Sequence, residues 1–166
     1  MMSGLTAVHI AILLAAAILL VAAAINDAYR YKIPNLISLA LMGLFPVFVL
    51  TAPRSVEWDQ HIMVFLLVLL SGFAMFIGNL AGAGDIKLLA ATSLWAGPHL
   101  VAVFLIITAV AGGILAFIMA ALTYARNRTN KRALAVAKVP IPYGIAIATG
   151  GLSTICMLSF PLLFPG

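Results

Sequence analysis

The sequence predicts an all-α fold, a polytopic bundle of transmembrane helices that forms one membrane-embedded domain over residues 1–166. Two observations lead to this class. The chain is 65% hydrophobic and only 8% charged, whereas an average soluble domain is about half apolar and a quarter charged. Its apolar residues also fall into long runs of about the length that a bilayer crossing requires. A soluble globular domain and a disordered chain are therefore both excluded.

Three helices are expected in the first half of the chain. The first covers residues 5–26, and we expect it to be retained rather than removed as a signal peptide, because no basic residue precedes Arg30. A second helix covers residues 36–52 and contains Pro46, which should kink it. A third helix covers residues 61–80 and follows a short polar loop.

The second half contains an apolar stretch, residues 86–124, that is too long for one crossing. At about 1.5 Å per residue it would form roughly 58 Å of helix, about twice the thickness of the hydrocarbon core. Gly97 and Pro98 interrupt the stretch and provide a reversal. This division predicts a short fourth helix, residues 86–96, which places Asp85 at the floor of a pocket open to water. With a last helix over residues 142–164, the bundle has six helices.

The chain contains nine Lys and Arg residues. Six membrane crossings would divide them unequally between the two sides of the membrane. Only Arg54 falls on one side, beside Glu57 and Asp59. Because cytoplasmic loops are enriched in basic residues, both termini are expected outside, with loops one, three and five in the cytoplasm. The basic loop over residues 126–138 is expected to touch anionic membrane lipid, and no nucleic-acid partner is expected. The expected cytoplasmic cations are Arg30, Lys32, Lys87, Arg126, Arg128, Lys131, Arg132 and Lys138.

The four acidic residues divide into two pairs. Glu57 and Asp59 lie in the outer loop, where water solvates a charge. Asp27 and Asp85 each adjoin the end of an apolar helix, where a carboxylate at membrane depth costs about 2.5 kcal/mol or more. Either these two are interfacial residues that pair with basic neighbours, or they form a functional pair on the cytoplasmic side.

Short motifs accompany both of these aspartates. Gly82 and Gly84 lead into Asp85, and glycine lets a backbone approach another backbone or a substrate closely. An ordinary helix–loop–helix turn would explain them equally well. After Asp27, Pro34 fixes the exit of the loop and Asn35 can cap the second helix. Such a cap would hold the segment against the bundle, although a purely structural role accounts for it as well.

Paired aspartates have a well-defined chemistry. Two carboxyl groups that share a site cannot easily both ionise, so one retains a proton. The ionised group can take a proton from a water molecule that attacks a peptide carbonyl, while the protonated group assists the carbonyl oxygen and the leaving nitrogen. The helix ends favour Asp85 as base and Asp27 as acid, although a coupled pair can exchange these roles. The reaction needs no metal, and the single Cys156 and the scattered histidines form no metal-binding motif.

The sequence around both aspartates resembles the type IV prepilin leader peptidases, membrane aspartic proteases of the G-x-G-D class. The matching residues are Asp27 with Ile33-Pro34-Asn35, and the stretch from Gly82 to Ala90. A weaker match begins at Pro140, at the start of the last helix. The chain is most similar to the short form associated with tight-adherence, or Flp-type, pili.

By this resemblance, Asp27 and Asp85 are the catalytic pair, and the substrate is a prepilin. Cleavage would occur at the cytoplasmic boundary of the bacterial inner membrane, where the basic leader of the prepilin meets its apolar stalk. No cofactor is implied, and other pilus-assembly proteins are potential partners. The implied supporting residues are Gly82, Gly84, Pro34, Asn35 and Lys87. Lys87 would orient Asp85 or contact the substrate, unless it only extends to the headgroups.

The sequence departs from the larger, bifunctional members in one respect. Those members carry an N-terminal cytoplasmic extension, often with paired cysteines, and also N-methylate the trimmed pilin. This sequence starts directly at its first helix, so we expect peptidase activity without methyl transfer and without S-adenosylmethionine. Two other classes stay open, namely a small proton-coupled transporter with intramembrane aspartates and a non-catalytic subunit of a pilus machine.

Overall fold

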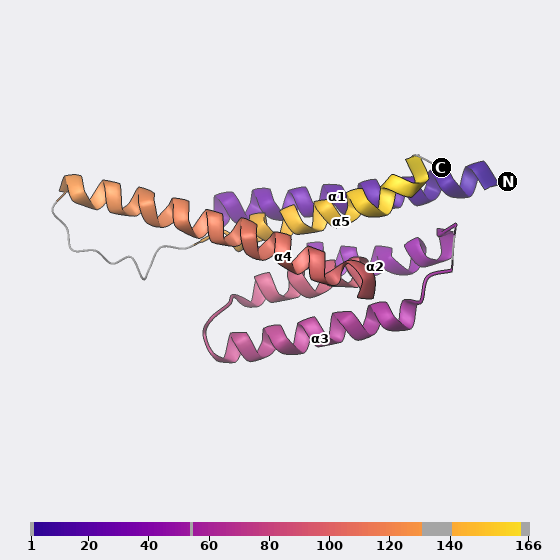
Figure 1. Cartoon of the computed structure of the whole chain (residues 1–166), viewed down its shortest axis with the longest axis horizontal. Helices are drawn as coiled ribbons and strands as arrows, with labels where there is room; N and C mark the ends of the chain where they lie inside the picture. The colour runs from indigo at the N-terminus through magenta and orange to yellow at the C-terminus, as the bar shows by residue number, and fades with distance from the viewer. Residues whose placement is uncertain (1, 54, 131–140, 164–166) are drawn as a thin grey trace.

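The computed structural model describes residues 2–53, 55–130 and 141–163, and these residues form helices joined by short loops (Figure 1). The expected all-α class is therefore confirmed for the described chain. The N-terminal end of α1 and the C-terminal end of α5 lie together at one end of the molecule (Figure 1). The helices are α1 (Met2–Arg30), α2 (Asn35–Thr51), α3 (Trp58–Ile77), α4 (Ala83–Asn130) and α5 (Tyr143–Leu163).

Four of these helices are long and apolar enough to cross a membrane. The apolar spans within them are Thr6–Arg30, Trp58–Ile77, Ala83–Ala125 and Tyr143–Phe160. The α2 helix is also apolar but has only 17 residues, about 26 Å of helix. This arrangement is that of a multi-pass membrane protein.

The six expected helices are not matched one for one, because the predicted fourth and fifth helices are joined across a kink in the single element α4, which leaves five elements in the described chain. The helix is interrupted only at Gly97, which has φ 58° and ψ −170°. At this residue the chain turns back on itself (Figure 1). One glycine therefore makes the whole reversal, and no loop separates the first arm of α4 (residues 83–96) from the second arm (residues 98–130).

The reversal at Gly97 is supported by a side chain from α3. Pro98 has no N–H, so the carbonyl oxygen of Leu94 lacks its usual helical donor. The Nδ1 of His61 donates a hydrogen bond to this oxygen at 2.7 Å. In a bilayer no water can take that role, so His61 supplies the one partner that the proline removes. The His61 ring also occupies the space into which any side chain at position 97 would project.

The first arm of α4 lies at the centre of the bundle. Every residue from 90 to 97 is buried, as expected of a helix that is surrounded by others. Trp95 is only 1% exposed, and its indole N–H donates to the carbonyl oxygen of Leu41 in α2 at 3.1 Å. Lipid is as apolar as these side chains, so close packing rather than exclusion from water holds the helices together. The short helix predicted before Gly97 is thus the core of the structure.

The C-terminal end of α1 differs from expectation. The α1 helix continues to Arg30, so Asp27 lies in its last turn instead of in the loop after it. The helix stops at Tyr31, whose φ of 51° and N–H bond to the Asp27 carbonyl oxygen at 2.9 Å form a left-handed C-terminal cap. Residues 131–140, which contain most of the expected basic loop and Pro140, lie outside the described residues.

We predict that Gly97→Ala destabilises the fold. A side chain at this φ is strained by about 1–3 kcal/mol, and its Cβ would also overlap the His61 ring. The thermal midpoint of the protein in detergent should fall by several degrees. Gly113→Ala is the matched control, because it lies in the same helix with nothing within 4 Å of the added Cβ. Equal midpoints for the two variants would contradict this account of the reversal.

Candidate active site

A polar cavity of about 450 Å³ lies where α1 ends and α4 begins. It contains both Asp27 and Asp85, which are far apart in the sequence. The cavity also contains four of the five predicted supporting residues, whereas Pro34 is not part of its wall. The lining residues are Asp27, Tyr31, Lys32, Ile33, Asn35, Gly82, Ala83, Gly84, Asp85, Lys87 and Ile141.

Asp27 is held by a backbone group of α5. The residue is only 4% exposed, and its Oδ2 accepts a hydrogen bond from the N–H of Gly144 at 2.6 Å. Gly144 is the second residue of α5, so this N–H has no partner within the helix. Pro142, which precedes α5, has no side-chain oxygen that could cap it. Asp27 therefore caps α5 from another helix, and its position depends on the start of α5.

Gly144, which belongs to the weaker match that begins at Pro140 and was not among the expected supporting residues, lies directly against Asp27. A Cβ at this position would lie 2.8 Å from both the Cβ and the Oδ2 of Asp27. Any other residue would push the carboxyl group out of place. The Pro-Tyr-Gly sequence at positions 142–144 was the available signal, because a glycine directly after a helix start indicates a close approach of another chain segment.

Asp85 is the third residue of α4, and Gly82 directly precedes the helix. The N–H of Ile86 donates to the Gly82 carbonyl oxygen at 3.1 Å, which identifies Gly82 as the N-cap. The carboxyl group of Asp85 folds back toward this residue and accepts a backbone hydrogen bond from it. This is one half of a capping box. A Cβ at Gly82 would lie 2.8 Å from Oδ2 of Asp85, so the glycine leaves room for the carboxylate.

The structure assigns Asn35 a different role from the one expected. It does not cap α2, because α2 begins at Asn35 and its N-cap is Pro34, with no side-chain cap bond. Pro34 instead directs the chain into the helix, with φ −62° and ψ 131°. The side-chain oxygen of Asn35 accepts a hydrogen bond from Nζ of Lys87 at 3.1 Å. Lys87 thereby joins the start of α2 to the first arm of α4.

The loop before α2 also rests on the glycine turn. A Cβ at Gly84 would lie 3.5 Å from the Cβ of Ile33 and 3.7 Å from its carbonyl oxygen. These are ordinary van der Waals distances, so the two segments lie close together and an alanine would also fit at position 84. Together with the Lys87–Asn35 bond, the contact brings the segment after Asp27 against the segment that carries Asp85.

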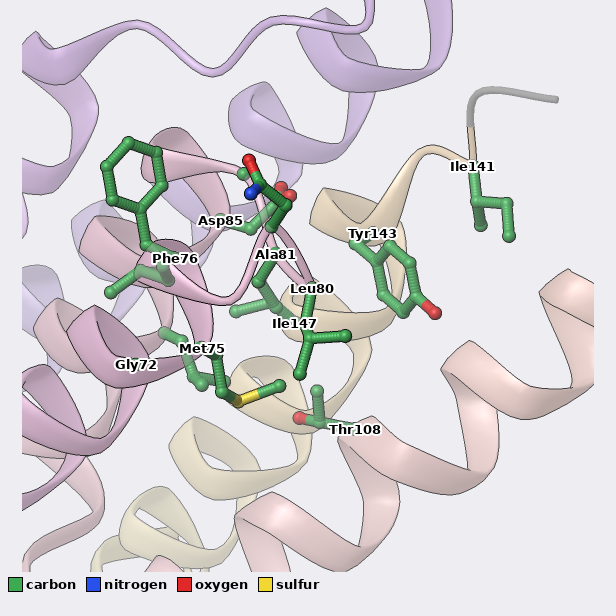
Figure 2. A pocket seen from close by; sticks show the side chains of 14 residues that line it. Gly72, Met75, Phe76, Leu80, Ala81, Asp85, Thr108, Ile141, Tyr143 and Ile147 are labelled. Carbon is green, nitrogen blue, oxygen red and sulfur yellow. The ribbon is translucent and has the colours of Figure 1, made fainter. Parts of the chain in front are cut away.

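A second, mainly apolar cavity of about 530 Å³ adjoins the polar one (Figure 2). Both cavities include Gly82, Asp85 and Ile141 in their walls. Figure 2 shows Asp85 at one side of the apolar cavity, with Met75 and Leu80 on another part of its wall. Asp85 thus lies where the polar cavity and the apolar cavity meet.

The C-terminal end of α3 shapes this apolar cavity. The N–H of Leu80 donates to the Met75 carbonyl oxygen at 2.9 Å, and the N–H of Asn79 donates to Phe76 at 2.9 Å. With Asn79 at φ 56°, this is a Schellman motif. The motif ends α3 and directs the chain back toward Gly82, and it places Leu80 on the cavity wall.

The arrangement is suited to acid–base chemistry. Two carboxyl groups line one polar cavity, one held by the start of α5 and the other by the start of α4. Among the residues that the structure describes, no group of three or more His, Cys, Asp or Glu residues could hold a metal ion. The described site therefore offers two carboxyl groups that can exchange protons with a bound molecule or with water.

The sequence was also compared with known proteins. A family profile described as the type IV leader peptidase family matches residues 14–117, more than half of the chain. The matched segment includes Asp27, Asp85 and the glycine turn. No curated protein and no solved structure matches the chain significantly. The chain therefore belongs to the type IV leader peptidase family, which implies a membrane peptidase with a prepilin substrate.

Proposed function

We propose that this protein is an aspartic endopeptidase that removes the leader peptide of type IV prepilins of the Flp-like kind. Asp27 and Asp85 are the catalytic pair, and residues 1–166 act as one membrane-embedded domain. The observation that carries the proposal is the polar cavity, which brings both carboxyl groups together. The family supports the peptidase activity, and the two carboxyl groups supply the aspartic chemistry.

In the proposed reaction, a water molecule lies between the two carboxyl groups. The ionised aspartate removes a proton from this water as its oxygen attacks the carbonyl carbon of the scissile bond. The protonated aspartate donates to the carbonyl oxygen, so that a neutral tetrahedral intermediate forms. When the intermediate collapses, the C–N bond breaks and the leaving nitrogen takes the proton from the aspartate that accepted one from water. A hydroxyl group of the intermediate returns a proton to the other aspartate, so the carboxyl product forms and the pair regains its starting state. The roles of Asp27 and Asp85 stay interchangeable.

The site has a polar part beside an apolar part, as a prepilin has a polar leader beside an apolar stalk. Lys32, Asn35 and Lys87 line the cavity that contains both aspartates, and this space suits a hydrated backbone. The apolar cavity begins at Asp85, and it suits the stalk that stays in the bilayer. A peptide bond at the junction would have its polar leader on one side and its apolar stalk on the other.

We place this end of the bundle in the cytoplasm of a bacterium, at its inner membrane, with both termini outside. Arg30, Lys32 and Lys87 lie at the same end as the polar cavity, and cytoplasmic ends of membrane proteins are enriched in such residues. Cleavage would then take place at the cytoplasmic boundary of the membrane. Membrane lipid and other pilus-assembly proteins are the proposed additional partners.

The proposal includes cleavage alone, without methyl transfer. Mass spectrometry of the trimmed pilin, produced by the protein with S-adenosylmethionine present, distinguishes a free amine from an N-methylated terminus.

A proton-coupled transporter is the second candidate, and it would favour carboxyl groups near the middle of the bilayer. Asp27 lies in the last turn of α1 and Asp85 in the first turn of α4, and these positions favour the peptidase.

We predict that Asp27→Asn and Asp85→Asn each lower the rate of prepilin cleavage at least about a thousandfold. Each change removes one of the two groups that the acid–base reaction requires. The measurement is cleavage of a purified prepilin by the reconstituted protein, followed on gels and by mass spectrometry. The thermal midpoint of each variant in detergent checks that it is folded.

Two outcomes would contradict the peptidase proposal. One is a prepilin that the wild-type protein leaves uncut when it is tested against several Flp-like candidates. The other is cleavage that survives both substitutions. The second result would also favour a non-catalytic role for the two aspartates.

Gly144→Ala should lower the kcat/KM for cleavage at least about tenfold. The added methyl group would overlap Asp27 and displace the carboxyl group, and a displacement of about 1 Å can cost a hundredfold in rate. Gly43→Ala is the matched control, since it makes the same chemical change in a helix where nothing lies within 4 Å of the new Cβ. If both variants cleave the prepilin equally well, the Gly144 contact does not position Asp27 for catalysis.

A further inference from the structure

The apolar cavity in Figure 2 continues along α3 into a second apolar space of about 410 Å³. The two spaces have Gly72, Met75 and Leu89 in common. Together they form one hollow, here named the α3–α4 groove. Beyond the common residues, its far half is lined by Val64, Leu67, Val68, Ser71, Val101 and Leu105.

The groove exists because α3 packs loosely. Gly72 is its one buried residue, and a Cβ there would lie 2.6 Å from the side chain of Ile86 in the first arm of α4. This close contact holds α3 against the first arm. The second arm of α4 diverges from α3 as it returns from Gly97 (Figure 1). A wedge of space is therefore left between α3 and the second arm.

The groove extends from the level of the polar cavity into the bundle. Asp85 and Thr108, which both line its near end, lie almost equally far along the chain from the reversal at Gly97. They are therefore at similar depth. On α3 the groove reaches from Met75 back to Val64, about 17 Å along the helix axis. This length accommodates about three turns of a helical ligand.

We propose that the α3–α4 groove docks the apolar helix of the prepilin, on the membrane side of the bond that is cut. This inference rests on the function proposed above. The groove and the polar cavity meet at Gly82, Asp85 and Ile141, so a chain that passes Asp85 from the polar side continues directly into the groove. Its apolar wall excludes the charged leader, because a charge among apolar side chains at membrane depth is costly.

The groove then sets the direction and the register of the substrate. A helix seated between α3 and the second arm can move deeper into the groove only until its first polar residues reach Asp85. The far half is lined by apolar side chains such as Val68 and Leu105, against which an apolar helix can pack. A lipid chain could also fill an apolar groove, and the experiment separates the two occupants.

The test places a photoreactive residue, benzoylphenylalanine, at position 68 or at position 66 of the full chain. Val68 lines the groove, whereas Leu66, which is 47% exposed, lies on the opposite face of α3 at nearly the same depth. Both proteins carry Asp27→Asn, which leaves the groove residues intact, and both are reconstituted in vesicles with a Flp-like prepilin. Position 68 should crosslink to the prepilin and position 66 should not. Crosslinks to lipid alone, or equal crosslinks from both positions, would overturn the inference.

Cleavage provides the second measurement, made without Asp27→Asn. Val68→Trp should fill the groove and reduce the kcat/KM for prepilin at least about tenfold, mainly through a higher KM. Leu66→Trp should leave it unchanged. If Val68→Trp and Leu66→Trp both cleave like the wild-type protein, the groove is not the docking site although the protein is a peptidase. A wild-type protein that cuts no prepilin is a different result, and it refutes the proposed function itself.

Discussion

The structure depends on the requirement that every backbone polar group in a bilayer find a partner within the protein. The reversal of α4 at Gly97 meets this requirement at a point where the helix breaks. Pro98 removes one donor, and His61 replaces it with a hydrogen bond to the Leu94 carbonyl oxygen. Because the break is satisfied in this way, the first arm of α4 can be short and buried over residues 90–96. Its other end then places Asp85 at the polar cavity.

The candidate site is made from the ends of helices. Asp27 lies in the last turn of α1 and caps the start of α5, and Asp85 lies in the first turn of α4 and folds back on its own N-cap. Helix ends are where backbone donors are unsatisfied, so each carboxyl group has a fixed donor. Three helices that are distant in the sequence thereby hold one pair of carboxyl groups in place.

Polarity changes within a short distance at this site. The cavity with both aspartates carries lysine and asparagine side chains, whereas the groove that adjoins it at Asp85 is mainly apolar. A substrate with a charged leader and an apolar stalk crosses the same change in polarity at its cleavage point. Under the proposed function, cleavage specificity would follow from the match between these two polarity boundaries.

The amino-acid sequence alone was enough to predict the all-α class, a multi-pass membrane protein and the reversal at Gly97 and Pro98, and it singled out Asp27 and Asp85 as candidate site residues. These features follow from composition, from the length of apolar runs and from the cost of a carboxylate beside an apolar helix. Only the tertiary structure decided how the aspartates are held. The donor to Asp27 is the N–H of Gly144, which is 117 residues away in the chain. The local sequence can indicate a close approach at Gly144, but not which segment approaches it.

Asn35 and the helix count also show that the local sequence does not specify contacts between distant segments. Asn35 has the sequence context of a cap, yet its oxygen accepts from Lys87, 52 residues away, because α2 already begins at that residue. The reversal needed one glycine instead of a loop, since His61 from α3 could satisfy the broken backbone. The α3–α4 groove likewise depends on the angle between α3 and the second arm of α4. Local sequence determines which segments are helical, whereas close contacts at small residues such as Gly72 and Gly144 decide how they meet.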